Sequence, residues 1–205
     1  GRPLNILVIG SDSRAGANTE LGTGSEAGIP GMRADTTMLV HISADRSHVD
    51  VVSIPRDTLV DIPACSRSDG TTSDPQYNVM FNSAFETGGV NGDVGSAAAC
   101  TILTVEKLTG IYIDDFVVVD FAGFINVVDA LGGVAMYIPE DIEDRDAQLS
   151  IEAGCRLLDG ETALGFARAR KAVGDGSDIS RIGRQQDLVL EIVDETLSSN
   201  LLRNP

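Results

Sequence analysis

The sequence has no tryptophan, and its 205 residues include only two histidines and two lysines. It contains neither a GxSxG nor an HExxH motif, which together with the scarcity of histidine argues against a Ser–His–Asp hydrolase and a histidine-based metal centre. It also lacks the GxxxxGK loop of P-loop NTPases and the GxGxxG turn of dinucleotide-binding folds. The common nucleotide-binding and serine-hydrolase classes are therefore not indicated.

Positive charge is scarce as well, because 15 Lys and Arg stand against 31 Asp and Glu, for a formal net charge of −16. So acidic a chain repels phosphate backbones, which argues against nucleic acid as a partner. Yet 13 of the 15 cations are arginine, and five of the 15 lie between Leu164 and Gln186. A GC-rich genome can raise the share of arginine, but it does not explain this clustering. Arginine binds phosphate or carboxylate through two parallel hydrogen bonds, so the cluster predicts a bound anion.

No run of about 18 apolar residues occurs, and the sequence shows no signal peptide. The chain enters an apolar, strand-like segment almost at once, at Leu4. We therefore expect that an N-terminal segment has been trimmed from this chain. The lack of an anchor in this sequence is weak evidence about the full-length protein.

The three cysteines, Cys65, Cys100 and Cys155, form no CxxC pair and have no metal-ligand spacing with the histidines. Cys65 lies in the polar loop "IPACSRSDGTTSD", which we do not expect to bury a thiol. Disulfide bonding would indicate an oxidising, extracytoplasmic compartment, whereas three free thiols would fit the cytosol. Both readings stay open from the residues alone.

A hydrophobic content of 42% with 22% charged residues is typical of a globular chain, and the length fits one domain over residues 1–205. Apolar runs predict strands at Leu4–Gly10, Asp35–Ser43, His48–Pro55, Asp114–Asp120 and Val134–Pro139. Helical periodicity and end signals predict helices at Asn78–Thr87, Gly95–Leu108, Phe121–Gly133, Leu158–Arg168 (N-capped by Asp159) and from about Ile182 onward. This order predicts an α/β layered sandwich with a central mixed β-sheet flanked by helices.

Two aspartates stand where predicted strands end or begin. Asp12 follows the first strand in "GSDSR", and Asp35 opens the second in "RAD". If the two strands pair, the carboxylates approach one another and suit Mg²⁺, which proteins hold with one or two carboxylates, substrate phosphates and water. Taken alone, the two aspartates have another interpretation, in which they are turn or helix N-cap residues and bind no metal.

Arginines occupy the same kind of position. Arg33 precedes the second strand, and Arg56 follows the third, directly before Asp57. An isolated arginine in such a place is more often a surface residue paired with its neighbour. The convergence of several arginines with a carboxylate pair instead predicts a pyrophosphate with its Mg²⁺.

The remaining cations of interest lie near the C-terminus. Arg168 and Arg170 would splay onto different faces if the helix continued through them, and would point more nearly together if the chain left the helix in extended form. Arg181 and Gln185 are four residues apart and share a helical face. These side chains extend the predicted anion site.

Taken in order, seven stretches resemble the LytR–CpsA–Psr family of cell-wall glycopolymer ligases, and they span nearly the whole chain. The loop around Cys65 and the wording "GDGSDISRIGRQQ" are similar to actinobacterial members, for which the resemblance implies a Cys65–Cys100 disulfide. The seven stretches are "NILVIGSDSR", "RADTTMLVHIS", "VSIPRDTLVDIP", "NSAF…GG", "VEKLTGIYIDDFVVVDFAGFINVVDALGGV", "LLDGETALGFARARK" and "DISRIGRQQ".

The resemblance implies an enzyme at the extracytoplasmic face of the cell membrane, anchored by an N-terminal transmembrane helix. The implied reaction is Mg²⁺-dependent and moves a glycopolymer from a polyprenyl-pyrophosphate carrier to a peptidoglycan or other cell-wall acceptor, with formation of a phosphodiester. The polyprenyl chain would lie in an apolar tunnel between sheet and helices. The alternatives are a non-catalytic module that binds polyprenyl-phosphate glycans, and a pyrophosphohydrolase with water as acceptor.

The resemblance also implies roles for individual residues. Asp12 and Asp35 fall on the positions of the Mg²⁺ carboxylates. Met80 departs from the family pattern, since many members have a phosphate-contacting lysine there. The implied pyrophosphate-binding residues are Arg14, Arg33, Arg56, Asn82, Arg168, Arg170, Arg181, Arg184 and Gln185. The expected catalytic residues are Arg56, Arg168, Arg170, Arg181, Asp57 and Asp178, with Asp57 or Asp178 placed to orient or deprotonate the acceptor hydroxyl.

Overall fold

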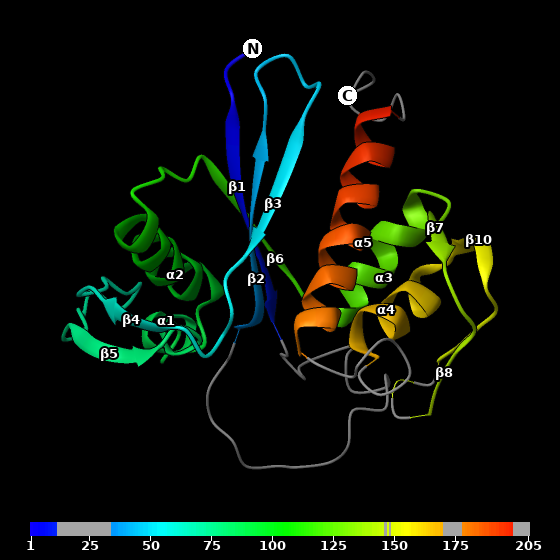
Figure 1. The fold of residues 1–205 in the computed structure, drawn as a ribbon. Helices are drawn as coiled ribbons and strands as arrows, with labels where there is room; N and C mark the ends of the chain where they lie inside the picture. The colour runs from blue at the N-terminus through cyan, green and yellow to red at the C-terminus, as the bar shows by residue number, and fades with distance from the viewer. Residues whose placement is uncertain (12–33, 146, 148, 170–177, 199–205) are drawn as a thin grey trace. The chain divides into compact units, whose positions relative to one another are not determined.

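The computed structural model describes residues 1–11, 34–145, 147, 149–169 and 178–198, with side chains in the last range described from 182 to 197 (Figure 1). The chain divides into two compact units, Gly1–Phe121 and Ala122–Pro205. The expectation of a single domain over residues 1–205 stays a prediction. Among the described residues, no helix has both the length and the apolar character needed to cross a membrane.

The first unit is built on a four-stranded mixed sheet in the order β3-β2-β1-β6 (Figure 1). The register sets Leu7 opposite Leu39 and Val8 opposite Val117. β1 is antiparallel to β2 and parallel to β6, and β2 is antiparallel to β3. The strands are β1 (Leu4–Ser11), β2 (Ala34–Ile42), β3 (Val49–Ser53) and β6 (Asp115–Val119).

Two helices accompany this sheet, α1 (Ser83–Gly88) and α2 (Val94–Thr109). Leu7, Ile9 and Leu39 of the sheet share one buried core with Ala97 and Val105 of α2, so α2 covers one face of the sheet. The predicted α/β class, with a central mixed sheet and flanking helices, is confirmed.

The helices α1 and α2 pack closely because a glycine lies at their contact. A Cβ at Gly88 would lie 2.2 Å from the carbonyl oxygen of Ser96, so no other residue fits there without movement of the backbone. The side chain of Asp93 caps α2 by accepting a hydrogen bond from the backbone N–H of Ser96 at 3.0 Å. These local features fix how α1 and α2 pack against each other.

A separate antiparallel hairpin, β4 (Leu59–Ile62) with β5 (Gln76–Met80), lies beside α2. The predicted helix over Asn78–Thr87 is therefore wrong in its first part, because Asn78–Met80 belongs to β5 and the helix begins at Ser83. Val79 pairs with Val60, and such β-branched pairs favour a strand.

The Cys65–Cys100 disulfide is present and ties the loop after β4 to α2. The expectation that Cys65 lies in an unburied environment is wrong, because both cysteines are fully buried in the core of the first unit. Cys155 is free and exposed. The loop is polar in composition, but the disulfide draws its cysteine inward.

The strand predicted from the apolar run at Asp114–Asp120 forms, but it is only partly buried. Phe116 is 40% exposed and Val117 48% exposed, because β6 lies at an edge of the four-stranded sheet. An edge strand has a neighbour on one side alone, so its apolar composition does not ensure burial.

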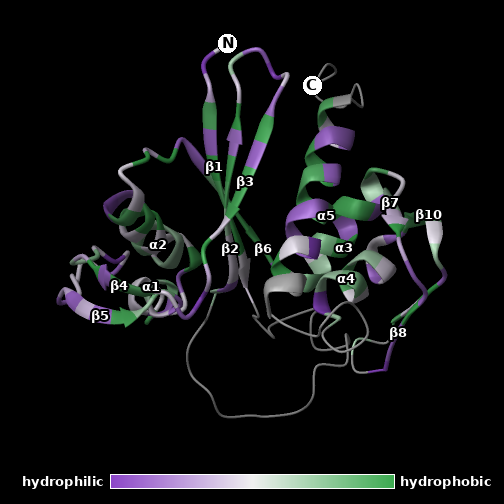
Figure 2. Ribbon diagram, in the orientation of Figure 1, coloured by the Kyte–Doolittle hydropathy of each residue, from purple (hydrophilic) through white to green (hydrophobic). Residues whose placement is uncertain are grey.

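The second unit has its own core, which includes Val128, Ile138, Leu158, Phe166 and Leu188. The amphipathic helix α5 shows alternating hydrophilic and hydrophobic bands in Figure 2, and it begins at Asp178, earlier than the expected Ile182. The helices of the second unit are α3 (Phe121–Ala130, whose first residue closes the first unit), α4 (Gly160–Arg168) and α5 (Asp178–Ser198). Its strand pairs are β7 (Val134–Ile138) with β10 (Gly154–Leu158), and β8 (Ile142–Asp144) with β9 (Leu149–Ile151).

Candidate functional site

Arg56 lies in the turn after β3 and is held between two carboxylates. Its Nη1 donates a hydrogen bond to Oδ1 of Asp35 at 3.0 Å, and its Nε lies 3.7 Å from Oδ2 of Asp57. The side chains of Arg56 and Asp35 are 37% and 46% exposed. Ion pairs this accessible contribute only about 0–1 kcal/mol to stability. The arrangement therefore positions a guanidinium at the surface more than it stabilises the fold.

Backbone hydrogen bonds hold this turn in place. The N–H of Thr58 donates to the carbonyl of Pro55 at 3.0 Å, which closes the turn around Arg56. The N–H of Asn82 then donates to the carbonyl of Arg56 at 3.0 Å. Four of the predicted site residues thus lie together, and we call Asp35, Arg56, Asp57 and Asn82 the Arg56 cluster.

The predicted Mg²⁺ pair is described in part. Asp35 is the second residue of β2, and Ser11, the last residue of β1, pairs with Ala34. Asp35 fits Mg²⁺ as one carboxylate whose coordination is completed by phosphate oxygens and water, the arrangement this ion commonly adopts. Asp12, Arg14 and Arg33 lie outside the described residues. Among the residues that are described, no three His, Cys, Asp or Glu side chains gather into a metal-binding group.

In the second unit, Arg168 is the last residue of α4 and is half-buried. The helix ends there, and Ala169 is extended with φ −55° and ψ 130°. This is the extended departure from the helix that would let Arg168 and Arg170 point together. Arg170 itself lies outside the described residues.

Two side chains of α5 bind the backbone on either side of Arg168. Nη2 of Arg184 donates to the carbonyl of Ala169, and Nε2 of Gln185 donates to the carbonyl of Ala167 at 3.0 Å. Arg184 is only 7% exposed. Both residues therefore position the segment that carries Arg168, a contribution that sequence reasoning missed, and their predicted contact with pyrophosphate stays a prediction.

The start of α4 is fixed as predicted. Oδ1 of Asp159 accepts a hydrogen bond from the N–H of Thr162 at 2.8 Å and caps the helix. Hydrogen bonds from the hydroxyl and then the N–H of Thr162 hold the pKa of Asp159 below its usual value. The helix that presents Arg168 is thus secured at both ends.

The first turn of α5 holds two further predicted residues, Asp178 and Arg181. Their side chains lie outside the described part of the chain. The catalytic roles expected for them stay predictions.

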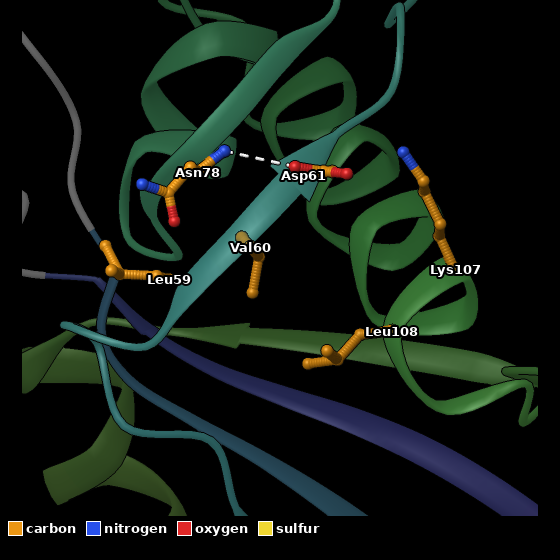
Figure 3. A pocket seen from close by; sticks show the side chains of 6 residues that line it. All are labelled: Leu59, Val60, Asp61, Asn78, Lys107 and Leu108. Atoms are coloured by element: carbon orange, nitrogen blue, oxygen red, sulfur yellow. Dashed lines mark hydrogen bonds between the residues drawn. The ribbon is translucent and has the colours of Figure 1, made fainter.

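The first unit also contains a pocket of about 340 Å³ beside the β4–β5 hairpin and α2, which the sequence did not predict (Figure 3). It was missed because the hairpin itself was not expected. One residue of the pocket could have been noticed in the sequence, because Lys107 is one of only two lysines in the chain. The lining residues are Leu59, Val60, Asp61, Asn78, Lys107 and Leu108.

Comparison with known proteins gives matches along the whole chain. Residues 1–204 match the model of the LytR_cpsA_psr family. The probable cell wall biosynthesis protein LcpB of Corynebacterium glutamicum is 35% identical over 206 residues, which is 98% of this chain and 44% of that protein. The polyisoprenyl-teichoic acid–peptidoglycan teichoic acid transferase TagV of Bacillus subtilis is 29% identical over 204 residues, covering 97% of this chain and 45% of TagV.

The fold agrees with that of a solved relative. The crystal structure of B. subtilis TagV superposes with a TM-score of 0.66 at 28% identity, covering 95% of this chain and 65% of the TagV chain. The chain spans about half the length of the curated relatives that it matches. The activities in the relatives' names belong to those longer proteins, and for this chain they are proposals.

Proposed function

Because the chain belongs to the LytR–CpsA–Psr family, we propose that it is the catalytic domain of a glycopolymer transferase of the cell wall. The proposed reaction moves a glycopolymer from a polyprenyl-pyrophosphate carrier to peptidoglycan or another cell-wall acceptor. TagV, a relative along nearly the whole chain, is named as such a transferase for teichoic acid. The observation that carries the proposal is the half-exposed Arg56, held beside Asp35 at the motif "SIPRDT".

In the proposed reaction, a hydroxyl of the acceptor sugar attacks the phosphorus next to the glycan. The bond from that phosphorus to the bridging oxygen breaks, and polyprenyl phosphate leaves with the electron pair. Arg56 and Arg168 bind the pyrophosphate and stabilise the negative charge that grows on the leaving group. Arg170, Arg181 and the other predicted arginines are proposed to bind the same anion.

The acceptor proton must also be taken up. In the first unit, Asp57 suits this role, because its Oδ2 lies 3.7 Å from Nε of Arg56 and its side chain is 62% exposed. A carboxylate at that place can orient the hydroxyl and accept its proton. We propose Asp57 as the base, with Asp178 as the second candidate.

The proposed cofactor is Mg²⁺, held by Asp35 and Asp12 together with oxygens of the pyrophosphate. When bound, the ion would neutralise charge on the pyrophosphate. Asp35 is suited to this role because its carboxylate is 46% exposed beside Arg56.

We propose that the protein acts in the cell envelope, at the extracytoplasmic face of the membrane. The Cys65–Cys100 disulfide supports an oxidising compartment, because such bonds rarely persist in the cytosol. LcpB is named as a probable cell wall biosynthesis protein, which supports a place in the cell envelope. The proposed anchor is an N-terminal transmembrane helix of the full-length protein.

The test is product analysis with a synthetic polyprenyl-pyrophosphate glycan labelled in its sugar, with and without peptidoglycan fragments. A transferase gives equal amounts of polyprenyl phosphate and of labelled peptidoglycan carrying a phosphodiester, and only when acceptor is present. Equal amounts of polyprenyl phosphate and glycan phosphate without acceptor would identify a pyrophosphohydrolase instead. Donor binding without any cleavage, unchanged by Asp35→Asn, would identify a binding module.

A further inference from the structure

The pocket beside the β4–β5 hairpin has an apolar side and a polar side. In Figure 3 the side chains of Leu59, Val60 and Leu108 lie along the lower part of the view. The polar groups of Asp61, Asn78 and Lys107 lie along the upper part. A ligand that fills this pocket must therefore present a hydrocarbon surface on one side and hydrogen-bonding groups on the other.

The apolar side chains around the pocket are unusually exposed. Leu59 is 59% exposed and Leu108 is 48% exposed, while Val60 beneath them is 5% exposed. The ring of Tyr77 is 67% exposed and lies 6.0 Å from Nζ of Lys107. Exposed apolar side chains that line a hollow, with an aromatic ring near its lysine, are typical of a binding site.

The polar side is held in position by the hairpin. Oδ1 of Asp61 accepts a hydrogen bond from the backbone N–H of Asn78 at 3.0 Å. Asn78 has a φ of +52°, a left-handed conformation that asparagine tolerates better than most residues. This contact joins the two strands and fixes the Asp61 carboxylate at the rim.

The charges of the lining favour a neutral ligand. Asp61 carries one negative charge and Lys107 one positive charge, so the net charge of the lining is zero. A pyrophosphate or a carboxylate ligand would meet Asp61 at the rim. A lipid tail would place hydrocarbon against the polar side chains of Asp61, Asn78 and Lys107 and remove water from them without offering new hydrogen bonds.

We propose that this pocket binds one N-acetylhexosamine residue of the acceptor glycan, an inference that rests on the proposed transfer to a cell-wall acceptor. The pyranose ring and the acetamido methyl would pack on the exposed side chains of Leu59 and Leu108. The sugar hydroxyls would donate to Asp61 and pair with the amide of Asn78 and the ammonium of Lys107. The volume of about 340 Å³ lies at the small end of ligand pockets, which suits a single small moiety.

The experiment is an amide-resolved NMR titration of the intact chain with chitotetraose, a β-1,4-linked N-acetylglucosamine tetramer. Saturable shifts are expected at Leu59–Asp61, Asn78 and Lys107–Leu108. Cellotetraose, which has the same linkage without acetamido groups, serves as the control and should bind several-fold more weakly. No saturable shift at these amides, or equal binding of the two sugars, would overturn the assignment.

Variants separate this pocket from the pyrophosphate site. Lys107→Met and Asp61→Ala change exposed side chains, and each is expected to weaken chitotetraose binding about tenfold, the effect of losing one hydrogen bond to a charged group. Arg156→Met is the control, because it removes a partly exposed arginine of the second unit that pairs with Glu152. It should leave sugar binding unchanged. Wild-type affinity in both pocket variants would contradict the proposal.

Donor binding distinguishes failure of this inference from failure of the proposed function. Lys107→Met should bind the polyprenyl-pyrophosphate donor with wild-type affinity while it transfers to peptidoglycan more slowly. A wild-type chain that binds chitotetraose at the pocket but cleaves no donor would contradict the transferase and support the sugar site. Equal loss of donor binding and of sugar binding in Lys107→Met would contradict a separate acceptor pocket.

Discussion

At the scale of single residues, exposure separates two roles among the arginines. Arg56 is 37% exposed between Asp35 and Asp57, where it can contact an anion from solution. Arg184 is 7% exposed and donates to the carbonyl of Ala169. Both occupy positions that the family resemblance assigns to pyrophosphate binding. The exposure of Arg56 suits the ligand role that we propose for it, whereas Arg184 has a positioning role that the sequence did not show.

The Asp159 cap makes a prediction about acid stability. Its lowered pKa means that the ionised carboxylate stabilises the fold fully above about pH 4, the ordinary range of an aspartate. This contribution is lost as the pH falls through the lowered pKa of the folded state. We expect Asp159→Ala to reduce the free energy of unfolding by about 1 kcal/mol at pH 7, measured by urea unfolding.

Asp159→Asn is the matched control for that prediction. Asparagine caps a helix about as well as aspartate does, so stability at pH 7 should stay near that of the wild type. Because asparagine does not ionise, the variant should lose less stability than the wild type between pH 5 and about pH 3. Equal acid loss in the two proteins would show that the Asp159 charge is not responsible.

At the scale of elements, the disulfide attaches the loop between β4 and β5 to α2. It closes a loop with a sequence separation of 35 residues, and its cysteines have Cα atoms 5.3 Å apart. We expect the Cys65→Ser/Cys100→Ser protein to lose about 2–4 kcal/mol of unfolding free energy, by thermal or urea unfolding. Cys155→Ser changes an exposed free thiol and should leave the stability unchanged. Mass spectrometry that finds all three thiols alkylated without reduction would remove the basis of this prediction.

The contact between α5 and the end of α4 leads to a second prediction at this scale. Replacing Arg184 by methionine removes a buried, charge-assisted hydrogen bond to Ala169, so we expect a loss of about 1.5–3 kcal/mol. Hydrogen exchange should rise most at the C-terminal end of α4, from Phe166 to Ala169. Asp187→Ala, at an exposed position of the same helix, is the control and should change neither quantity. Unaltered exchange at that end of α4 in Arg184→Met would contradict the positioning role.

Long, periodic elements could be predicted from the sequence, and short ones could not. The apolar run of β1 and the helical pattern of α2 are strong local signals, and both elements form nearly where expected. β8 and β9 have three residues each, too few to show a period. β10 pairs with β7, a partner remote in sequence, so its pairing leaves no local signal.

The candidate site shows the same limit. The motifs identified Asp35 and Arg56 as separate residues with separate roles, one for metal and one for phosphate. The structure joins them in one ion pair, because backbone hydrogen bonds from Asn82 and within the Pro55–Thr58 turn set the direction of Arg56. Such bonds depend on the folded backbone and leave no trace in residue type.

At the scale of the whole molecule, the net charge of −16 acts against any anionic donor. Salt screens charges in solution beyond about 10 Å, so the donor is selected by close contacts and not by the overall field. This makes the local arginines decisive for the proposed function. It also explains why so few cations suffice in so acidic a chain.

The most direct measurement is therefore the rate of phosphodiester formation with saturating donor and peptidoglycan, compared among wild type, Arg56→Ala, Arg168→Ala and Arg156→Ala. Each contact of a buried or bound charge contributes roughly 1.5–3 kcal/mol, so Arg56→Ala and Arg168→Ala should each be slower by about one to two orders of magnitude. Arg156→Ala, which removes an arginine paired with Glu152, should keep the wild-type rate. Near wild-type rates in both Arg56→Ala and Arg168→Ala would contradict the account.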